Sequence, residues 1–322
     1  MRFLPLSALD DCYWYSFNDE PIAAGSPYIT PRLSSPAFLL PDETPDAIWH
    51  LFAHTWMGIE HYTSTSGLEW KREKLLFRGG HSPFVFHDGS IYYLIFEIHT
   101  RTYGRKGEKS SASRIMLSTS TDLMLWSAPR KILDSTSVPF ASWRGNVPRL
   151  FHPQLVSWEG RYRLYFGAGA WKLRQPDETV AASFGYAESF YPEGPYDVIP
   201  EPVIKTDGDN EARSLATGHV RLVPCSDGMA AVECAYYYDE ILKKPRSHML
   251  LLESRDGLQF NIKREIQKSP ERGWAAYYLT SSDIKYKENE ETWYCYYSAT
   301  GKEEGPNPLV RESLGLLLGK RR

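Results

Sequence analysis

The sequence predicts an all-β protein, a five-bladed β-propeller with about four antiparallel strands in each blade. Three observations predict this fold class: a recurring pair of apolar segments around a polar turn, the spacing of these pairs along the chain, and a high aromatic content. The 322-residue chain contains 10 Trp and 21 Tyr, residue types that pack well on the pleated surface of a β-sheet.

The recurring pair is clearest in the second half of the chain. Thr217–Val223 favours a strand, the polar residues up to Gly228 favour a tight turn, and Met229–Tyr238 favours a second, antiparallel strand. Similar units begin at Ser35, Ser82, His152 and Ser282. Their spacing of roughly 45 to 70 residues is typical of propeller blades built from short strands.

The repeats cover nearly the whole chain and therefore predict one domain, residues 1–322. The blades are expected near residues 31–77, 78–133, 146–204, 214–266 and 275–320. Residues 1–30 form an N-terminal closing segment, in which Cys12–Phe17 alternates enough to make a strand. We expect this strand to close the ring against the C-terminal segment.

Composition excludes several classes of function. A net charge of -3 provides no overall basic field, so a nucleic-acid partner is not expected. No run of about 18 apolar residues predicts a membrane span, and Asp10 and Asp11 interrupt the N-terminus before it forms the apolar core of a secretory signal. The four cysteines show no CxxC spacing and are expected to be reduced thiols of a cytoplasmic protein.

Three stretches resemble the five-bladed propeller glycosidases, the clan of glycoside hydrolase families 43, 32, 62 and 68. Ala216–Val223 is similar to the Gly-His strand of family 43, Phe184–Tyr196 to its outer strand and turn, and Ser64–Trp70 to a turn shared across the clan. The resemblance spans residues 31–320 and implies a carbohydrate-active propeller. It also implies calcium or another metal near His219 at the propeller axis, whereas the residues by themselves establish no cofactor.

The chain departs from this clan where the clan places its catalytic aspartates. In the first two blades those positions hold Ser35-Pro36 and Ser82-Pro83. The matching positions of the later blades are predicted at His152-Pro153, His219-Val220 and Ser282-Asp283. The general acid of the clan has no match near Arg149, so its three-carboxylate mechanism cannot be transferred residue by residue.

Glycoside hydrolysis normally requires two carboxyl groups, so other carboxylates are candidates. Glu97 ends an apolar strand at the expected mouth of the central funnel, where partial desolvation would raise its pKa; the alternative is an ordinary rim carboxylate. Glu233 lies within a buried strand and either acts in catalysis or pairs with an inner arginine such as Arg221. Asp283 stands one place past its blade's predicted position and faces either the axis or the sheet.

Histidines and aromatic residues supply candidate binding groups. His81, His152 and His219 occupy similar places in three blades, where they suit sugar hydroxyls, water, packing, or zinc or another transition metal. The remaining candidates lie at strand ends and in connections that reach the mouth, where indoles stack on sugar rings. They are His54, Trp56, Trp143, Trp171 and Arg213.

The sequence therefore predicts a glycoside hydrolase-like protein that processes a glycoside or oligosaccharide with carboxylates outside the usual positions. The expected ligand is a small carbohydrate bound at the axial funnel. The alternative is a non-catalytic propeller that binds a sugar or a protein through the same funnel. A metal-dependent lyase or hydrolase that uses the histidine cluster is the third reading.

Overall fold

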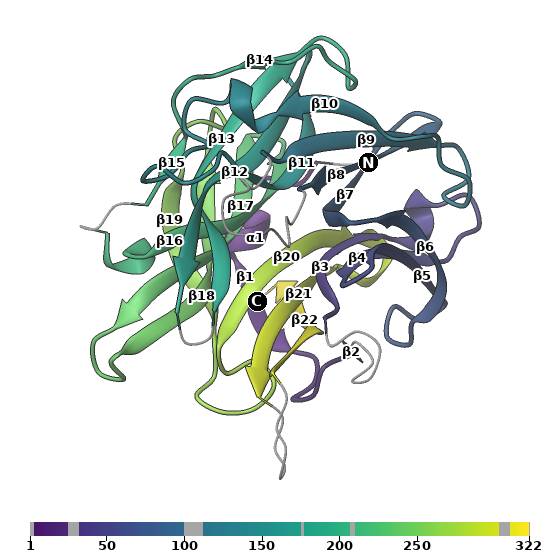
Figure 1. The fold of residues 1–322 in the computed structure, drawn as a ribbon. Coiled ribbons are helices and arrows are strands. Elements are labelled where there is room, and N and C mark those ends of the chain that lie inside the picture. Colours follow the sequence, from purple (N-terminus) through teal and green to yellow (C-terminus); the bar gives the residue numbers. More distant parts are fainter. Residues whose placement is uncertain are drawn as a thin grey trace.

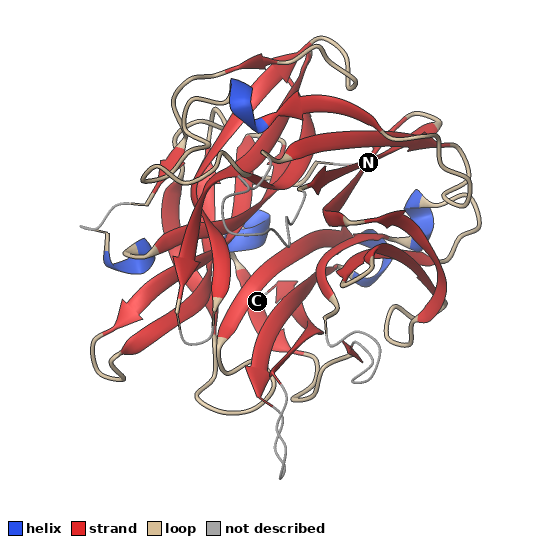
Figure 2. Cartoon of the chain, in the orientation of Figure 1, coloured by secondary structure: helices blue, strands red, loops and turns tan. Residues whose placement is uncertain are grey.

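The protein folds into five antiparallel β-sheets arranged around one axis, as the ribbon of the computed structural model shows (Figure 1). The structure describes residues 3–24, 32–99, 112–174, 177–206, 210–302 and 310–321. Strands make up nearly all of the regular structure (Figure 2). The prediction of an all-β, five-bladed propeller is confirmed, and no helix among the described residues is long and apolar enough to cross a bilayer.

Each blade is a sheet whose first strand is innermost. The first three blades comprise β3 (Ser34–Leu39), β4 (Trp49–Thr55), β5 (Gly58–Ser64) and β6 (Lys71–Arg78); β7 (Gly80–Asp88), β8 (Ile91–Ile98), β9 (Arg114–Ser120) and β10 (Arg130–Asp134); and β11 (Leu150–Trp158), β12 (Arg161–Leu173) and β13 (Glu178–Ser189), with the short β14 (Asp197–Val198) and β15 (Ile204–Lys205).

The fourth blade comprises β16 (Ala216–Cys225), β17 (Gly228–Asp239), β18 (Lys244–Ser254) and β19 (Asn261–Lys268). The fifth comprises β20 (Tyr278–Lys287), β21 (Thr292–Lys302), β22 (Val310–Arg321) and β1 (Cys12–Ser16), with β2 (Ala23–Ala24) also paired to β22. Short helices punctuate the connections: α1 (Ser7–Asp10), η1 (Pro41–Glu43), η2 (Ser135–Ser137), η3 (Glu211–Arg213) and η4 (Glu288–Glu290).

The two ends of the chain meet in the fifth blade, which confirms the predicted closing strand. Strand β1 pairs antiparallel with β22, from Cys12 opposite Arg321 to Ser16 opposite Leu317. The indole of Trp14 lies so close to Gly319 that a Cβ atom there would meet the ring at 2.9 Å. This pairing covers the edge of β22 and joins the two ends of the chain in one sheet, with β1 as the outermost strand.

Packing between neighbouring blades explains the uninterrupted apolar runs of the sequence. Every residue of β4 is buried, because both faces of this strand are covered. Between the fifth and first blades, Phe38 packs edge-on against Tyr296 and stacks with Trp49. Strands buried on both faces lose the simple alternation of a half-exposed sheet and appear as continuous apolar segments.

All five innermost strands are irregular near their first residues. The strand register shifts there in each blade, and Ser35, Ser82 and His152 adopt positive φ values of 49°, 51° and 47°. In the fourth blade the corresponding residue is Gly218, with φ 69°, and in the fifth the irregularity falls at Thr280. These positions line a common cavity at the axis.

The positions predicted for the fourth and fifth blades were therefore wrong. His219 lies one residue beyond Gly218, and a one-residue shift changes which side of a strand a residue faces. Ser282 lies two residues beyond Thr280 and therefore farther along its strand from the cavity. Both residues are buried below the cavity, where the backbone N–H of Ser282 donates to His219 Nδ1 at 3.3 Å.

Replacing Gly218 with Ala is expected to destabilise the fold by about 1–3 kcal/mol, the usual cost of a non-glycine residue in this backbone region. A Cβ atom at this position would also meet the carbonyl oxygen of Cys234 at 2.3 Å. Urea unfolding would measure the loss. Gly89→Ala is the matched control for positive φ without crowding, since φ is 64° there and no atom lies within 4 Å of the added Cβ. Equal losses in both variants would contradict a role for close packing at Gly218.

Candidate active site

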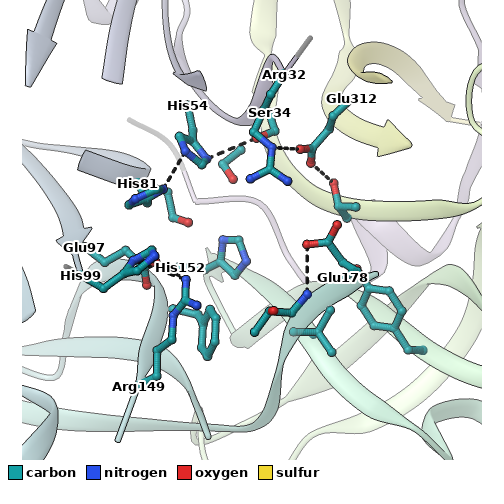
Figure 3. A pocket seen from close by; sticks show the side chains of 18 of the residues that line it. Arg32, Ser34, His54, His81, Glu97, His99, Arg149, His152, Glu178 and Glu312 are labelled. Atoms are coloured by element: carbon teal, nitrogen blue, oxygen red, sulfur yellow. Dashed lines mark hydrogen bonds and ion pairs between the residues drawn. The ribbon is translucent and has the colours of Figure 1, made fainter. Parts of the chain in front are cut away.

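A cavity of about 160 Å³ opens at the end of the axis where the innermost strands begin (Figure 3). The ends of β4 and β8 also reach it, because the second strand of each blade runs antiparallel to the first. The third strands run parallel to the first, so their starting residues arrive at the same end. Glu178 at the start of β13 and Glu312 near the start of β22 line the cavity for this reason.

Histidines form one side of the cavity. His54 Nε2 lies 2.6 Å from His81 Nδ1, and the His81 ring stacks on His99 with 4.3 Å between ring centroids. Burial lowers the pKa of His54 well below its ordinary value, that of His81 to about 3 and that of His152 to about 4. The imidazoles of His54, His81 and His152 are therefore neutral near pH 7 and can both donate and accept hydrogen bonds.

Glu97 lies beside these histidines and is almost completely buried. Its Oε1 is 3.4 Å from both Arg149 Nη2 and His99 Nδ1, whereas its Oε2 has no hydrogen-bond partner in the part of the chain that the structure describes. Burial raises the pKa of Glu97, but the hydrogen bond with His99 and the charge of Arg149 outweigh burial and lower this pKa to about 2. The expectation of a raised pKa for Glu97 was therefore wrong.

Glu178 lies on the opposite side of the cavity from Glu97 (Figure 3). Burial and the nearby carboxylate of Glu312 raise the pKa of Glu178 to about 7, against the opposing charge of Arg32. Glu312 itself is tied down, since Arg32 Nε lies 2.8 Å from its Oε2 and Thr280 Oγ1 donates to its Oε1 at 2.8 Å. Glu178 thus carries a proton in much of the population at neutral pH.

Sequence reasoning missed five charged residues of the cavity. They are Arg32, Arg149, Asp177, Glu178 and Glu312. It examined the starts of first strands and the ends of second strands for catalytic groups, but not the starts of third strands. The antiparallel order within a blade is the signal that could have identified Glu178 and Glu312.

Four of the predicted site residues meet in the cavity: His54, His81, His152 and Glu97. The other two carboxylates proposed for catalysis do not line it. Glu233 is fully buried and receives a 2.6 Å hydrogen bond from Arg213 Nη2. Asp283 accepts a hydrogen bond from the backbone N–H of Phe38 at 2.8 Å, a contact that joins the fifth blade to the first. It also lies 3.3 Å from Arg221 Nε of the fourth blade.

The remaining predicted residues also lie outside the residues that line the cavity. His219 packs below it, edge-on to His152 with 4.7 Å between centroids. Trp56 is 69% exposed at the turn between β4 and β5. Trp143 and Trp171 approach each other with Arg144 above the Trp171 ring at 4.3 Å. A role of these groups in binding remains a prediction.

Comparison with solved structures shows that the fold of this chain is shared with other proteins of known structure. No protein-family model and no curated protein sequence matches it. Among solved structures it is similar to Zg3597, a family 117 glycoside hydrolase of the marine bacterium Zobellia galactanivorans, with 14% identity, a TM-score of 0.60, and coverage of 96% of this chain and 90% of that one.

Two further structures show the same similarity. An N-acetylgalactosamine deacetylase from F. plautii, solved with blood group B trisaccharide, is 13% identical with a TM-score of 0.62, covering 96% of this chain and 95% of that one. A glycosyl hydrolase from Bacteroides ovatus is 13% identical with a TM-score of 0.59, covering 95% and 94%. The resemblance to the propeller glycosidases is thus confirmed for the fold, while families 43 and 32 are not identified.

Proposed function

We propose that the protein is a glycoside hydrolase that cleaves a glycosidic bond in the axial cavity. Glu178 is the proton donor, and Glu97 is the ionised carboxylate of the opposite wall. One observation carries the proposal: two carboxyl groups face one cavity, and their surroundings separate their pKa values to about 2 and about 7. Such a separation is how an enzyme assigns acid and base roles to chemically similar groups.

Glu178 suits the donor role because its proton is retained close to neutral pH. In glycoside hydrolysis the acid protonates the leaving oxygen as the bond to the sugar breaks. The proton must be available at the working pH yet be given up readily, which a pKa near 7 provides. The carboxylate of Glu312 helps to maintain this pKa by placing a negative charge beside Glu178, whereas the charge of Arg32 opposes it.

Glu97 suits the opposite role because it is ionised and has an oxygen available. Its Oε1 is engaged by Arg149 and His99, whereas Oε2 is free to accept a proton from water or to stabilise positive charge on the sugar. The rest of the lining is mostly polar, with imidazoles, hydroxyls and guanidinium groups that match the donors and acceptors of sugar hydroxyls, beside the apolar Phe151 and Val180. A cavity of about 160 Å³ suits a terminal sugar unit rather than a long segment of chain.

The similar structures support this proposal, since all three are named as enzymes that act on carbohydrates. The four cysteines are buried and unpaired, in keeping with the proposed cytoplasmic location. The alternative is a sugar-binding propeller without catalysis, which the polar cavity would also suit.

A panel of aryl glycosides and oligosaccharides, assayed between pH 5 and 9, tests the proposal. We expect turnover of at least one sugar, with a rate that falls as the pH rises through about 7, because Glu178 then loses its proton. Saturable sugar binding without turnover at any pH would favour the non-catalytic alternative. Turnover that increases steadily above pH 7 would contradict the role of Glu178 as the acid.

A further inference from the structure

We propose that His81, Glu97 and His99 bind a divalent transition metal ion, with zinc as the best match to this set of ligands. The inference concerns the wall of the cavity that faces Glu178. It goes beyond the proposed hydrolase because the ion can bind whether or not a glycoside is the substrate. The two proposals use Glu97 Oε2 in different ways, since an oxygen that binds the ion is not available to accept a proton from water. Two imidazoles and one carboxylate, with a further coordination position open to the cavity, form the ligand set of many catalytic zinc sites.

Strand register brings the three ligands together. His81 on β7 lies directly opposite Glu97 on β8, and His99 follows Glu97 by two residues. Residues opposite each other and residues two apart share a face of a sheet, so all three side chains project the same way. One ligand atom from each lies within 4.8 Å of the others, a separation that small side-chain rotations would close around an ion.

The unpartnered oxygen of Glu97 points independently to a ligand. The Glu97 side chain is only 2% exposed, yet its Oε2 has no hydrogen-bond partner among the described residues. A buried carboxylate oxygen without a partner is costly and rare in folded proteins. A metal ion between Glu97 and the two imidazoles would satisfy this oxygen.

The partners of His81 leave a lone pair available for the ion. Its Nδ1 lies 2.6 Å from His54 Nε2, and His54 Nδ1 lies 3.4 Å from Ser34 Oγ. We assign the tautomers so that His54 donates from Nδ1 to Ser34 and His81 donates from Nδ1 to His54. His81 Nε2 is then unprotonated, and its orientation is held by the type of outer partner that metal-bound histidines usually have.

Arg149 provides the competing explanation of the site. Its Nη2 lies 3.4 Å from Glu97 Oε1 and 3.3 Å from His99 Nδ1, so its charge already balances Glu97 in part. Arg149 leaves Oε2 unpaired, however, and its own side chain is 25% exposed and has room to move toward solvent.

Titration of tag-free, chelator-treated protein with Co²⁺ and Zn²⁺ tests the site. We expect one ion per chain, visible absorption bands of a Co²⁺ site with low coordination number, and displacement of Co²⁺ by Zn²⁺ in calorimetry. Glu97→Gln, which keeps the side-chain shape, should weaken Zn²⁺ binding by roughly 100-fold or more, beyond the effect of losing an outer partner. His87→Ala removes an exposed histidine from the same strand and should bind as the wild type does.

A second variant keeps the inference falsifiable if Glu97→Gln fails to fold. Arg149→Met removes a cation beside the site and should bind Zn²⁺ at least as tightly as the wild type. Absence of saturable Co²⁺ binding, or equal binding by wild type and Glu97→Gln, would overturn the proposal. Glycoside turnover by protein that binds no metal would contradict the proposed metal site and support the proposed hydrolase. Metal binding without any glycoside turnover would support the metal site and contradict the hydrolase.

Discussion

Replacing Glu178 with Gln is expected to lower kcat for a glycoside with a poor leaving group by about 10²–10⁴-fold, the usual contribution of a positioned general acid. Gln preserves the shape and the polarity of Glu178 but has no proton to donate. The loss should be much smaller for a dinitrophenyl glycoside, whose leaving group departs without protonation. Steady-state kinetics on a matched pair of substrates that differ only in the leaving group measures both effects.

Two further measurements separate proton donation from a structural role of Glu178. The decrease in rate above pH 7 should disappear in Glu178→Gln, because the group that titrates there is gone. Glu201→Gln is the matched control, since this carboxylate is not among the residues that line the cavity, is 78% exposed and pairs with Lys205 at 3.1 Å. An equal loss for good and poor leaving groups would show that Glu178 positions the substrate instead of protonating it.

Replacing Arg213 with Ala is expected to destabilise the fold by about 3–5 kcal/mol, the cost of removing one partner from a buried ion pair. Glu233 is fully buried, and the 2.6 Å hydrogen bond from Arg213 is the contact that compensates its charge. Burial already raises the pKa of Glu233 to about 7, against the opposing charge of Arg213. Denaturant unfolding at several pH values measures the loss.

The pH dependence of this loss follows from the direction of the shift. A carboxyl group whose pKa is higher in the folded state than in the unfolded state stabilises the fold most below its unfolded pKa, here 4.5. That stability is lost as the pH rises through about 7 in the wild type, and through a still higher pH without Arg213. The Arg213→Ala loss should therefore be larger at pH 8 than at pH 5.

A double variant tests whether the Arg213–Glu233 pair stabilises the protein or only offsets the free-energy cost of burying its two charges. Arg213→Met with Glu233→Leu should recover most of the lost stability, because neither buried charge remains. Lys243→Ala breaks the exposed pair with Glu240 and should cause no measurable change. A loss below 1 kcal/mol in Arg213→Ala would mean that Glu233 simply becomes protonated or hydrated.

Much of the fold could be predicted from local patterns. The paired apolar segments located the two innermost strands of each blade, and the alternation of Cys12–Phe17 located the closing strand β1. Register was harder to predict. The strand irregularities that place Gly218 and Thr280 on the cavity produce no recognisable pattern in the sequence. The cavity-facing positions of the fourth and fifth blades were therefore predicted one and two residues too late, at His219 and Ser282.

The sequence by itself determined the five-fold repetition, the absence of aspartates from the usual positions, and the meeting of His81 and His152 at one end of the axis, whereas His219, expected with them, is not among the cavity-lining residues. Only the tertiary structure decided which carboxylates face them. Glu178 and Glu312 come from different blades and meet only because the ring is closed, and the pKa of Glu178 depends on burial and repulsion that arise from that meeting. Periodicity is a local property of the chain, whereas desolvation and charge pairing depend on neighbours far away in sequence.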